Sequence, residues 1–338
     1  MTTHDQDERQ TGQLDGGGSP AVTGPGNTAV FTYVDQRTGE ETYLTRVSGP
    51  GLPPAEYQAW SDLRAADVPA GNVVAIHTDL RPSSLPGGYT LDALTAGFPN
   101  ATLSFSHPYG PDPAERAEGV AALTAQVESM ARLSGQAPPP RPHRVPLPEP
   151  APAAPSGPLP SDLAVRHYEP GLLAAAPLPE STRAALADPG LPADIRFFFT
   201  ADRPDAPPAG GLFVDASTHL RELGAELSEA AVDILSTHTR IGTDGRYVIT
   251  VQQEAGTVWA ANPASGSGRY VNGSVEAFTY CLADLHTTRA RMRGMDPYEA
   301  GAAVALLQAR LIALDPTCLD DAGNWWSVIV EQLWHGLF

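Results

Sequence analysis

The stretch from Val73 to Thr90 has the residue types and spacing most suggestive of chemistry. It begins as an apolar, β-branched run typical of a buried strand, and Pro82 should end that strand because proline cannot donate a ladder hydrogen bond. The turn that follows carries the hydroxyls of Ser83 and Thr90 and a glycine pair that permits positive φ. A strand that turns into a helix N-terminus is a common position for catalytic groups. This turn, however, offers hydroxyls and no thiolate or imidazole.

A helix is predicted just upstream, from Pro54 to Asp67, with Trp60 and Asp62 near its middle. Together the two stretches resemble the bacterial toxin-type branch of the zinc-dependent nucleic acid and nucleotide deaminases. In that family the first helix carries a His-x-Glu pair, and a strand leads to Pro-Cys, a Pro-Gly-Gly-Tyr turn and a second Cys. The His and the two thiolates hold zinc, which lowers the pKa of a bound water, while the Glu transfers protons.

Compared residue by residue with that family, Trp60 stands in place of the His and Asp62 in place of the Glu, while Ser83 and Thr90 replace the two Cys. An indole N–H only donates, and a neutral hydroxyl is a weak zinc ligand beside thiolate or imidazole. The resemblance therefore implies a deaminase fold with a degenerate site, and we expect no metal and no cofactor. The alternative is an ordinary strand, turn and helix without this ancestry.

The other residues that could bind a metal or a substrate match no known sequence motif. His77 and Asp79 lie two apart on one strand, which suggests either a residual polar pocket or, by the usual burial of such residues, a solvated strand face. The carboxylates near residue 320 lack the alternating oxygen ligands and central glycine of an EF-hand, so we expect a loop and a cap for the last helix. The glycine-rich turn at residues 242–245 has no P-loop lysine.

The composition indicates two domains and an acidic surface. The 338 residues include 39 acidic and only 21 basic side chains, for a net charge of −18, which disfavours nucleic acid and favours a basic protein partner. The two cysteines, Cys281 and Cys318, are predicted to be buried reduced thiols in the cytoplasm. The alternative is a disulfide bond between them. We expect neither a signal peptide nor a membrane span.

The first domain is predicted at residues 27–136, after a disordered tail at residues 1–26. Its pattern indicates an α/β fold, and the resemblance makes it an α/β/α sandwich. The expected elements are a hairpin at 29–35 and 41–48, a helix at 54–67, a strand from 73, a helix at 89–96, a strand at 101–106 and a helix at 115–133.

A proline-rich linker is predicted at residues 137–160, and a second, α+β domain at 161–338. Because the linker composition offers little core contact, we expect two independently folded domains. The expected elements of the second domain are a helix at 178–186, a strand at 195–200, a hairpin at 246–252 and 257–261, a strand at 269–272, and helices at 275–292, 297–314 and 324–337.

This second domain resembles the SUKH superfamily of bacterial immunity proteins, specifically its fourth subgroup. The resemblance implies a sheet backed by helices and a protein that neutralises nuclease or deaminase toxins by binding them, with no catalytic residues. The matching residues are Leu178-Pro179, Arg183, Leu186, Gly190-Leu191-Pro192, Ile241-Gly242, Tyr247–Val251, Gly256, Val258, Val271-Asn272, Ser274, Glu276, Phe278, Trp326 and Gly336-Leu337-Phe338.

We therefore predict a non-enzymatic cytoplasmic binding protein whose partner is a basic, nucleic-acid-directed protein toxin. Candidate partner contacts are Trp259, Asn272 and Trp325, since aromatic residues dominate interface energetics; helical spacing indicates that Trp325 or Trp326 belongs to the core. Two alternatives stay open. The first domain could retain unconventional deaminase chemistry around Asp62, His77 and Ser83, or it could bind a nucleotide without reaction.

Overall fold

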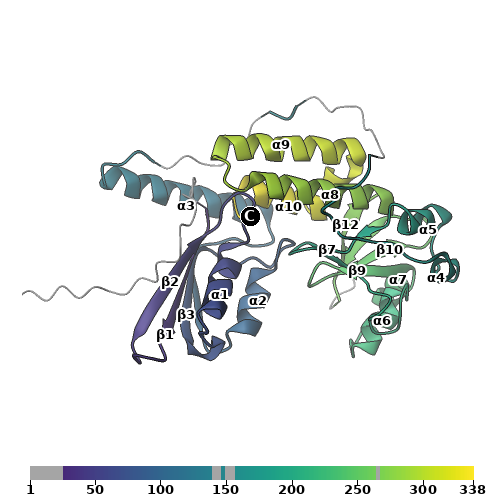
Figure 1. Ribbon diagram of the computed structural model, residues 1–338, viewed down its shortest axis with the longest axis horizontal. Coiled ribbons are helices and arrows are strands. Elements are labelled where there is room, and N and C mark those ends of the chain that lie inside the picture. The colour runs from purple at the N-terminus through teal and green to yellow at the C-terminus, as the bar shows by residue number, and fades with distance from the viewer. Residues whose placement is uncertain (1–25, 139–145, 149–156, 264–266) are drawn as a thin grey trace, which may run out of the picture.

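The computed structural model describes residues 26–138, 146–148, 157–263 and 267–338 (Figure 1). The predicted tail, apart from its last residue, lies outside the described residues, as does most of the predicted linker. We call residues 26–138 the N-terminal half and residues 157–338 the C-terminal half. Within the described ranges, no helix is long and apolar enough to cross a membrane.

The N-terminal half is built on a four-stranded sheet in the order β2-β1-β3-β4. The alternating apolar residues of β1 (Thr28–Val34) and β2 (Glu41–Val47) form the predicted antiparallel hairpin. Strand β3 (Val73–Leu80), preceded by a 3-10 turn η1 (Ala70–Asn72), pairs antiparallel with β1, and β4 (Thr102–His107) runs parallel to β3. The parallel pair requires a crossover, which is the turn and helix after β3.

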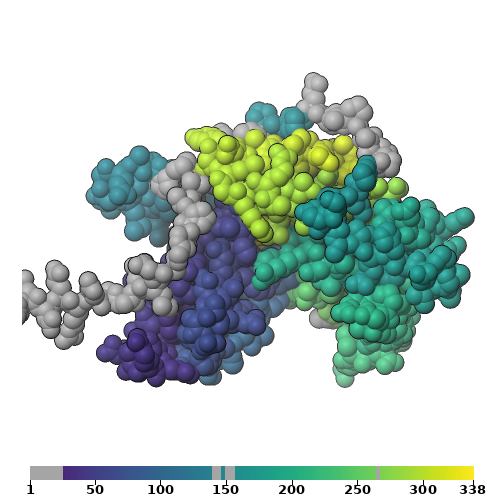
Figure 2. All heavy atoms as spheres, viewed as in Figure 1, coloured from purple at the N-terminus to yellow at the C-terminus, as the bar shows by residue number. Residues whose placement is uncertain are grey.

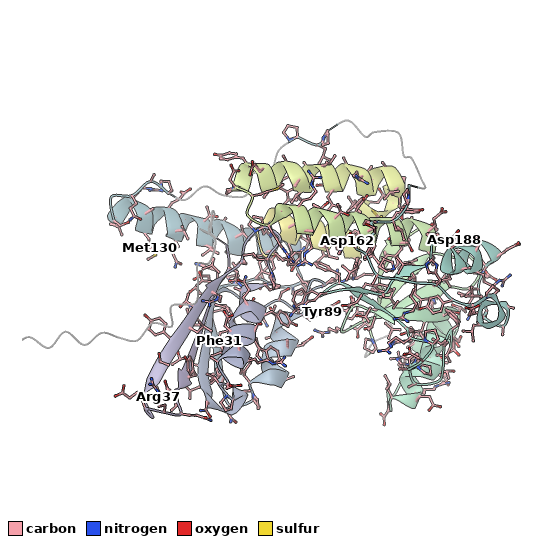
Figure 3. All side chains as sticks on the ribbon, in the orientation of Figure 1. Phe31, Arg37, Tyr89, Met130, Asp162 and Asp188 are labelled. Carbon is pink, nitrogen blue, oxygen red and sulfur yellow. The ribbon has the colours of Figure 1, made fainter. Side chains whose placement is uncertain are left out.

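Three helices complete this half. Helices α1 (Ala55–Ala65) and α2 (Thr90–Gly97) bury an apolar core against the sheet, centred on Phe31, Ile76 and Phe98. Helix α3 (Pro113–Leu133) begins at Asp112, whose carboxylate accepts the Ala114 N–H. Its far end projects away from the sheet, as Figure 1 shows, and Met130, labelled in Figure 3, is largely exposed there.

The C-terminal half contains a six-stranded antiparallel sheet in the order β12-β11-β10-β9-β8-β7. Helices α8 (Val275–Met292), α9 (Pro297–Leu314) and α10 (Trp325–Trp334) stack over it, as the helical spacing predicted (Figure 1). The strands are β7 (Asp194–Ile195), β8 (Phe199–Ala201), β9 (His238–Thr243), β10 (Val248–Gln252), β11 (Val258–Ala261) and β12 (Gly268–Asn272).

Smaller elements cover the remaining surfaces of this sheet. Helices α6 (Ala216–Glu222) and α7 (Glu229–Leu235) bury Val248 and Ala261, whereas Ile249 and Val251 on the same hairpin face α8 and α10. The mixed α/β and α+β class predicted from the sequence is therefore confirmed. The other elements are β5 (Val165–Arg166), α4 (Pro170–Ala174), α5 (Glu180–Ala187), β6 (Leu191–Pro192) and η2 (Pro316–Leu319).

The single strand predicted at residues 195–200 is wrong, because the chain reverses there. Strands β7 and β8 pair antiparallel around a tight turn in which Phe197 has φ +77° and the Phe198 N–H donates to the Ile195 carbonyl at 2.8 Å. In one extended strand Phe198 and Phe199 would face opposite sides of the sheet. The turn instead buries both rings, Phe198 against Phe338 and Phe199 against Phe278.

The two halves share one hydrophobic core, contrary to the expectation of little contact between them. Leu80, Leu85, Tyr109 and Leu123 of the N-terminal half belong to the same buried cluster as the residues between the C-terminal sheet and its helices. Figure 2 shows the C-terminal helices lying directly against the N-terminal half. The hydrogen bonds and ion pairs across this junction are Ser48–Gly336, Gly51–Arg293, Pro86–Gln332, Tyr89–Asp244, Asp92–Arg246, Tyr109–His335 and Arg116–Glu331.

Candidate functional site

The turn after β3 brings two of the predicted site residues together. The backbone N–H of Ser83 donates to Thr90 Oγ1 at 2.8 Å, and Ser83 Oγ accepts the Leu85 N–H at 3.1 Å. Gly87 and Gly88 have φ values of +110° and +120°, a region that only glycine occupies readily, so the predicted use of the glycine pair is confirmed.

Trp60 and Asp62 do not join this pair. The Trp60 ring packs on Phe98 at 5.0 Å between centroids, and its edge lies where a side chain at Gly97 would be. Asp62 forms an ion pair with Arg46 at 2.5 Å and is about two-fifths exposed. Neither residue lines the cavity beside Ser83 and Thr90, because both lie further along α1 than the end that faces the turn. The structure therefore does not bring Trp60 and Asp62 together with Ser83 and Thr90.

Glu56, in the first turn of α1, is the carboxylate that faces the turn instead. Its side chain is buried and accepts a hydrogen bond from Asn27 Nδ2 at 3.2 Å, while Asn27 Oδ1 accepts the Leu80 N–H at 2.9 Å. Burial raises the pKa of Glu56, opposed by hydrogen bonds from its own backbone, from Thr90 and from Asn27. The signal for this residue was present in the sequence, since Pro54-Ala55-Glu56 has the His-x-Glu spacing at the start of a helix.

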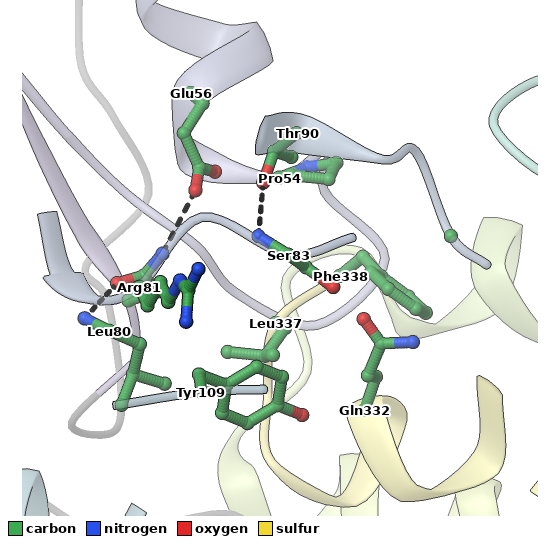
Figure 4. A pocket seen from close by; sticks show the side chains of 12 residues that line it. Pro54, Glu56, Leu80, Arg81, Ser83, Thr90, Tyr109, Gln332, Leu337 and Phe338 are labelled. Atoms are coloured by element: carbon green, nitrogen blue, oxygen red, sulfur yellow. Dashed lines mark hydrogen bonds between the residues drawn. The ribbon is translucent and has the colours of Figure 1, made fainter. Parts of the chain in front are cut away.

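These groups line a small cavity, shown in Figure 4, with Pro54, Glu56, Ser83 and Thr90 along one side. Its volume is about 20 Å³, room for roughly one water molecule and too little for a nucleobase. A proline ring and two hydroxyls do not make a zinc donor set. Among the residues that the structure describes, no group of three or more His, Cys, Asp or Glu side chains could hold a metal ion.

The C-terminal half closes this cavity from the other side. Gln332 Nε2 donates to the Pro86 carbonyl at 2.6 Å, and the side chains of Leu337 and Phe338 complete the cavity wall (Figure 4). The Phe338 ring lies so close to Gly87 that a Cβ there would come within 2.7 Å of it. The cavity is thus closed by side chains of the same chain.

A second buried contact joins the two halves beside the cavity. Tyr89, seen at the junction in Figure 3, donates its hydroxyl to Asp244 Oδ2 at 2.5 Å, and Trp325 Nε1 donates to the same oxygen at 3.0 Å. The N–H groups of Arg246 and Tyr247 bind the other carboxylate oxygen. Asp244 is thus the structural centre of the glycine-rich turn at residues 242–245, a role that no sequence pattern indicated.

Of the three predicted partner contacts, only Trp259 lies at the surface. Trp325 is fully buried between Phe278 and Trp326. The sequence predicted that one of the two tryptophans belongs to the core, and both do. Asn272 is also fully buried, where its side chain accepts from Trp326 and donates to Asp315. Neither Trp325 nor Asn272 can contact a partner without local unfolding.

The Trp259 ring, which is mostly buried but reaches the surface, packs on Tyr270 and His238 and lines a groove of about 260 Å³ with Ile234.

The remaining polar candidates have local structural roles. His77 binds the hydroxyls of Ser104 and Ser106, and Asp79 accepts the Thr28 N–H at 3.2 Å, so Asp62, His77 and Ser83 form no cluster. Asp315 caps η2 and accepts the Gly273 N–H, whereas the last helix begins at Asn324 without a side-chain cap. Both cysteines are free and buried.

Comparison with known families agrees with this architecture. The model of the Xanthomonas-like deaminase matches residues 24–126, and the model of the SUKH-4 immunity protein matches residues 142–332. No curated protein and no solved structure matches the chain.

The C-terminal fold and sequence thus define a SUKH-type immunity domain joined to a deaminase-like domain. The SUKH-4 match covers more than half of the 338 residues, and the chain belongs to the SUKH-4 immunity protein family.

Proposed function

We propose that the chain is a non-enzymatic immunity protein of the cytoplasm that neutralises a toxin by binding it. The observation that carries this proposal is the closed cavity at the deaminase position. It offers Pro54, Ser83 and Thr90 where a zinc enzyme needs ligands, and Phe338 occupies the substrate side. The SUKH-4 immunity protein family accounts for residues 142–332. The deaminase-like half then serves as a structural partner of that domain.

The surface that we propose for the toxin is the groove at Trp259. Aromatic residues in surface grooves are typical anchors of protein interfaces. Exposed carboxylates of Glu229 and Asp233 on α7 and of Glu254 in the β10–β11 turn belong to the elements that form or adjoin this groove. Together with the net charge of −18, these carboxylates favour binding of a basic toxin. They also favour an association rate that falls as the salt concentration rises.

Binding is tested by co-expressing the chain with a panel of bacterial deaminase and nuclease toxins and measuring survival and co-purification. We expect protection against at least one toxin, loss of protection with Trp259→Ala, and full protection with Tyr43→Ala, which removes an exposed aromatic from the N-terminal half. Protection that survives Trp259→Ala would move the binding surface elsewhere. Absence of both protection and complex across the panel would contradict immunity by direct binding.

The lack of chemistry is tested separately on the purified protein. Elemental analysis should find no stoichiometric zinc, and assays with cytidine, adenosine and single-stranded DNA should detect no deamination. One zinc per chain retained through dialysis against a weak chelator, or turnover abolished by Glu56→Gln, would show that the N-terminal half is an enzyme.

A further inference from the structure

Three arginines converge at the junction of the two halves. Arg196 lies in the β7–β8 turn with its guanidinium 4.8 Å from the centroid of the Phe197 ring. Arg289, near the end of α8, lies 4.9 Å from the Phe198 centroid and 6.0 Å from that of Phe197. Arg293 at the α8 C-cap donates to the Gly51 carbonyl of the N-terminal half at 3.4 Å.

No carboxylate of the described residues pairs with these three guanidinium groups, although acidic side chains outnumber basic ones almost two to one. The Nε of Arg289 is buried and has no hydrogen-bond partner. Arg116 is paired with Glu331 and Arg240 with Asp202, whereas the Nε of Arg166 is, like that of Arg289, buried without a hydrogen-bond partner. Burial and the charges of Arg293 and Arg196 lower the pKa of Arg289 to about 10, so it stays cationic at neutral pH.

Structural roles account for part of this cluster. The end of α8 favours cations through the helix dipole, and the rings of Phe197 and Phe198 attract them. These effects explain Arg289 and Arg293 singly. They do not explain why a third cation, on a different element, lies beside the other two, since three uncompensated like charges repel one another.

We propose that Arg196, Arg289 and Arg293 form a binding site for a phosphate group. The planar guanidinium fork matches phosphate oxygens bidentately, and a phosphate dianion would supply the missing charge. Arg196 and Arg293 are exposed, so the site is open to solvent. The group could arrive as inorganic phosphate or on a phosphorylated small molecule, since a depression of about 300 Å³, lined by Tyr57, Asp92 and Arg246 among others, meets the cluster at Phe197. This site does not depend on the proposed toxin binding.

The test is a calorimetric and thermal-shift titration of the whole chain with sodium phosphate, with chloride balancing the ionic strength. We expect saturable binding and a rise in Tm with phosphate and none with chloride. Arg196→Gln should weaken phosphate binding by at least about tenfold, the loss expected for a charge-assisted hydrogen bond. Arg291→Gln, a matched control in the same helical turn, should change Kd by less than about twofold. Arg289→Met removes the central charge and keeps apolar contact with Phe198.

Adenosine monophosphate and adenosine identify the source of the phosphate. Tighter binding of the monophosphate than of inorganic phosphate supports a phosphorylated small molecule, and equal binding supports free phosphate. Three results would overturn the proposal. They are no saturable effect of phosphate, equal phosphate affinity in Arg196→Gln and Arg291→Gln, or adenosine binding as tightly as its monophosphate.

Discussion

Individual side chains at the cavity show which residues the sequence could assign. The hydroxyls of Ser83 and Thr90 were predictable because a proline, a glycine pair and a following helix fix the local turn. The residue of α1 that faces these hydroxyls was not predictable. Several residues lie on the inner face of α1, and the sequence does not say which end of the helix lies next to the turn. Asp62 and Glu56 are both carboxylates on one helix, and only the tertiary arrangement selects Glu56.

Glu56→Gln should stabilise the protein above neutral pH. Burial raises the pKa of Glu56, so the folded state binds this proton more tightly than the unfolded state, whose pKa is near 4.5. That contribution is fully present below pH 4.5 and is lost as the pH rises through the raised folded-state value. Glutamine keeps an acceptor for Asn27 without the charge, so we expect a gain of about 1 kcal/mol at pH 8 and less at pH 4.

Urea unfolding of wild type and Glu56→Gln across this pH range measures the effect. Asp62→Asn is the control, since Asp62 is partly exposed and pairs with Arg46 at the surface. Equal stabilities of wild type and Glu56→Gln at pH 8 would contradict a buried ionised Glu56.

A restored zinc site offers a second comparison at this scale. The first triple variant combines Pro54→His, Ser83→Cys and Thr90→Cys, so that all three new ligands border the cavity. We expect it to bind one zinc per chain, because a His and two thiolates satisfy the donor preference of zinc. The second triple variant combines Trp60→His, Ser83→Cys and Thr90→Cys. Its histidine does not border the cavity, so we expect no stoichiometric zinc. Elemental analysis after dialysis distinguishes the two triple variants. Equal zinc content in both would contradict our placement of the site.

Whole elements were more predictable than their contacts. Long periodic helices such as α8 and α9 begin and end at the residues that the pattern indicated, because apolar spacing and caps at Ser274 and Asp296 act locally. The short strands β7 and β8 were missed, since three consecutive phenylalanines read as one strand and only the surrounding core makes a turn preferable. The role of Gln332, Leu337 and Phe338 as a wall of the N-terminal cavity depends on contacts more than 200 residues apart in sequence.

Phe338→Ala tests whether the end of α10 and the residues after it hold the cavity closed. The Phe338 ring is fully buried against Phe198 and Gly87, so truncation should lower the free energy of unfolding by about 3–5 kcal/mol. Leu133→Ala, at the exposed end of α3, is the control and should change it by less than about 0.5 kcal/mol. Chemical denaturation measures both. Similar small losses in the two variants would show that Phe338 does not pack as described.

At the scale of the whole molecule, the composition predicted two units and a linker but not how firmly they associate. Pro-rich segments look like spacers whether or not the domains on either side touch. The junction is set instead by apolar residues scattered through both halves and by paired groups such as Arg116 and Glu331, whose partners cannot be matched from one sequence. The domain limits of 27–136 and 161–338 stay predictions, whereas the shared core changes what cutting between them should do.

Cleavage at a protease site inserted between residues 146 and 148, which are exposed, should leave the two halves associated. The fragments share a buried core and seven polar contacts, so we expect them to co-elute from a sizing column at micromolar concentration. Arg116→Met should weaken this association by about a hundredfold or more, because Glu331 and two carbonyls would lose a buried cation. Arg132→Gln, whose ion pair stays within α3, should not. Separate elution of the fragments without further substitution would show that the two domains are independent. It would also contradict the role of the C-terminal half as a wall of the cavity.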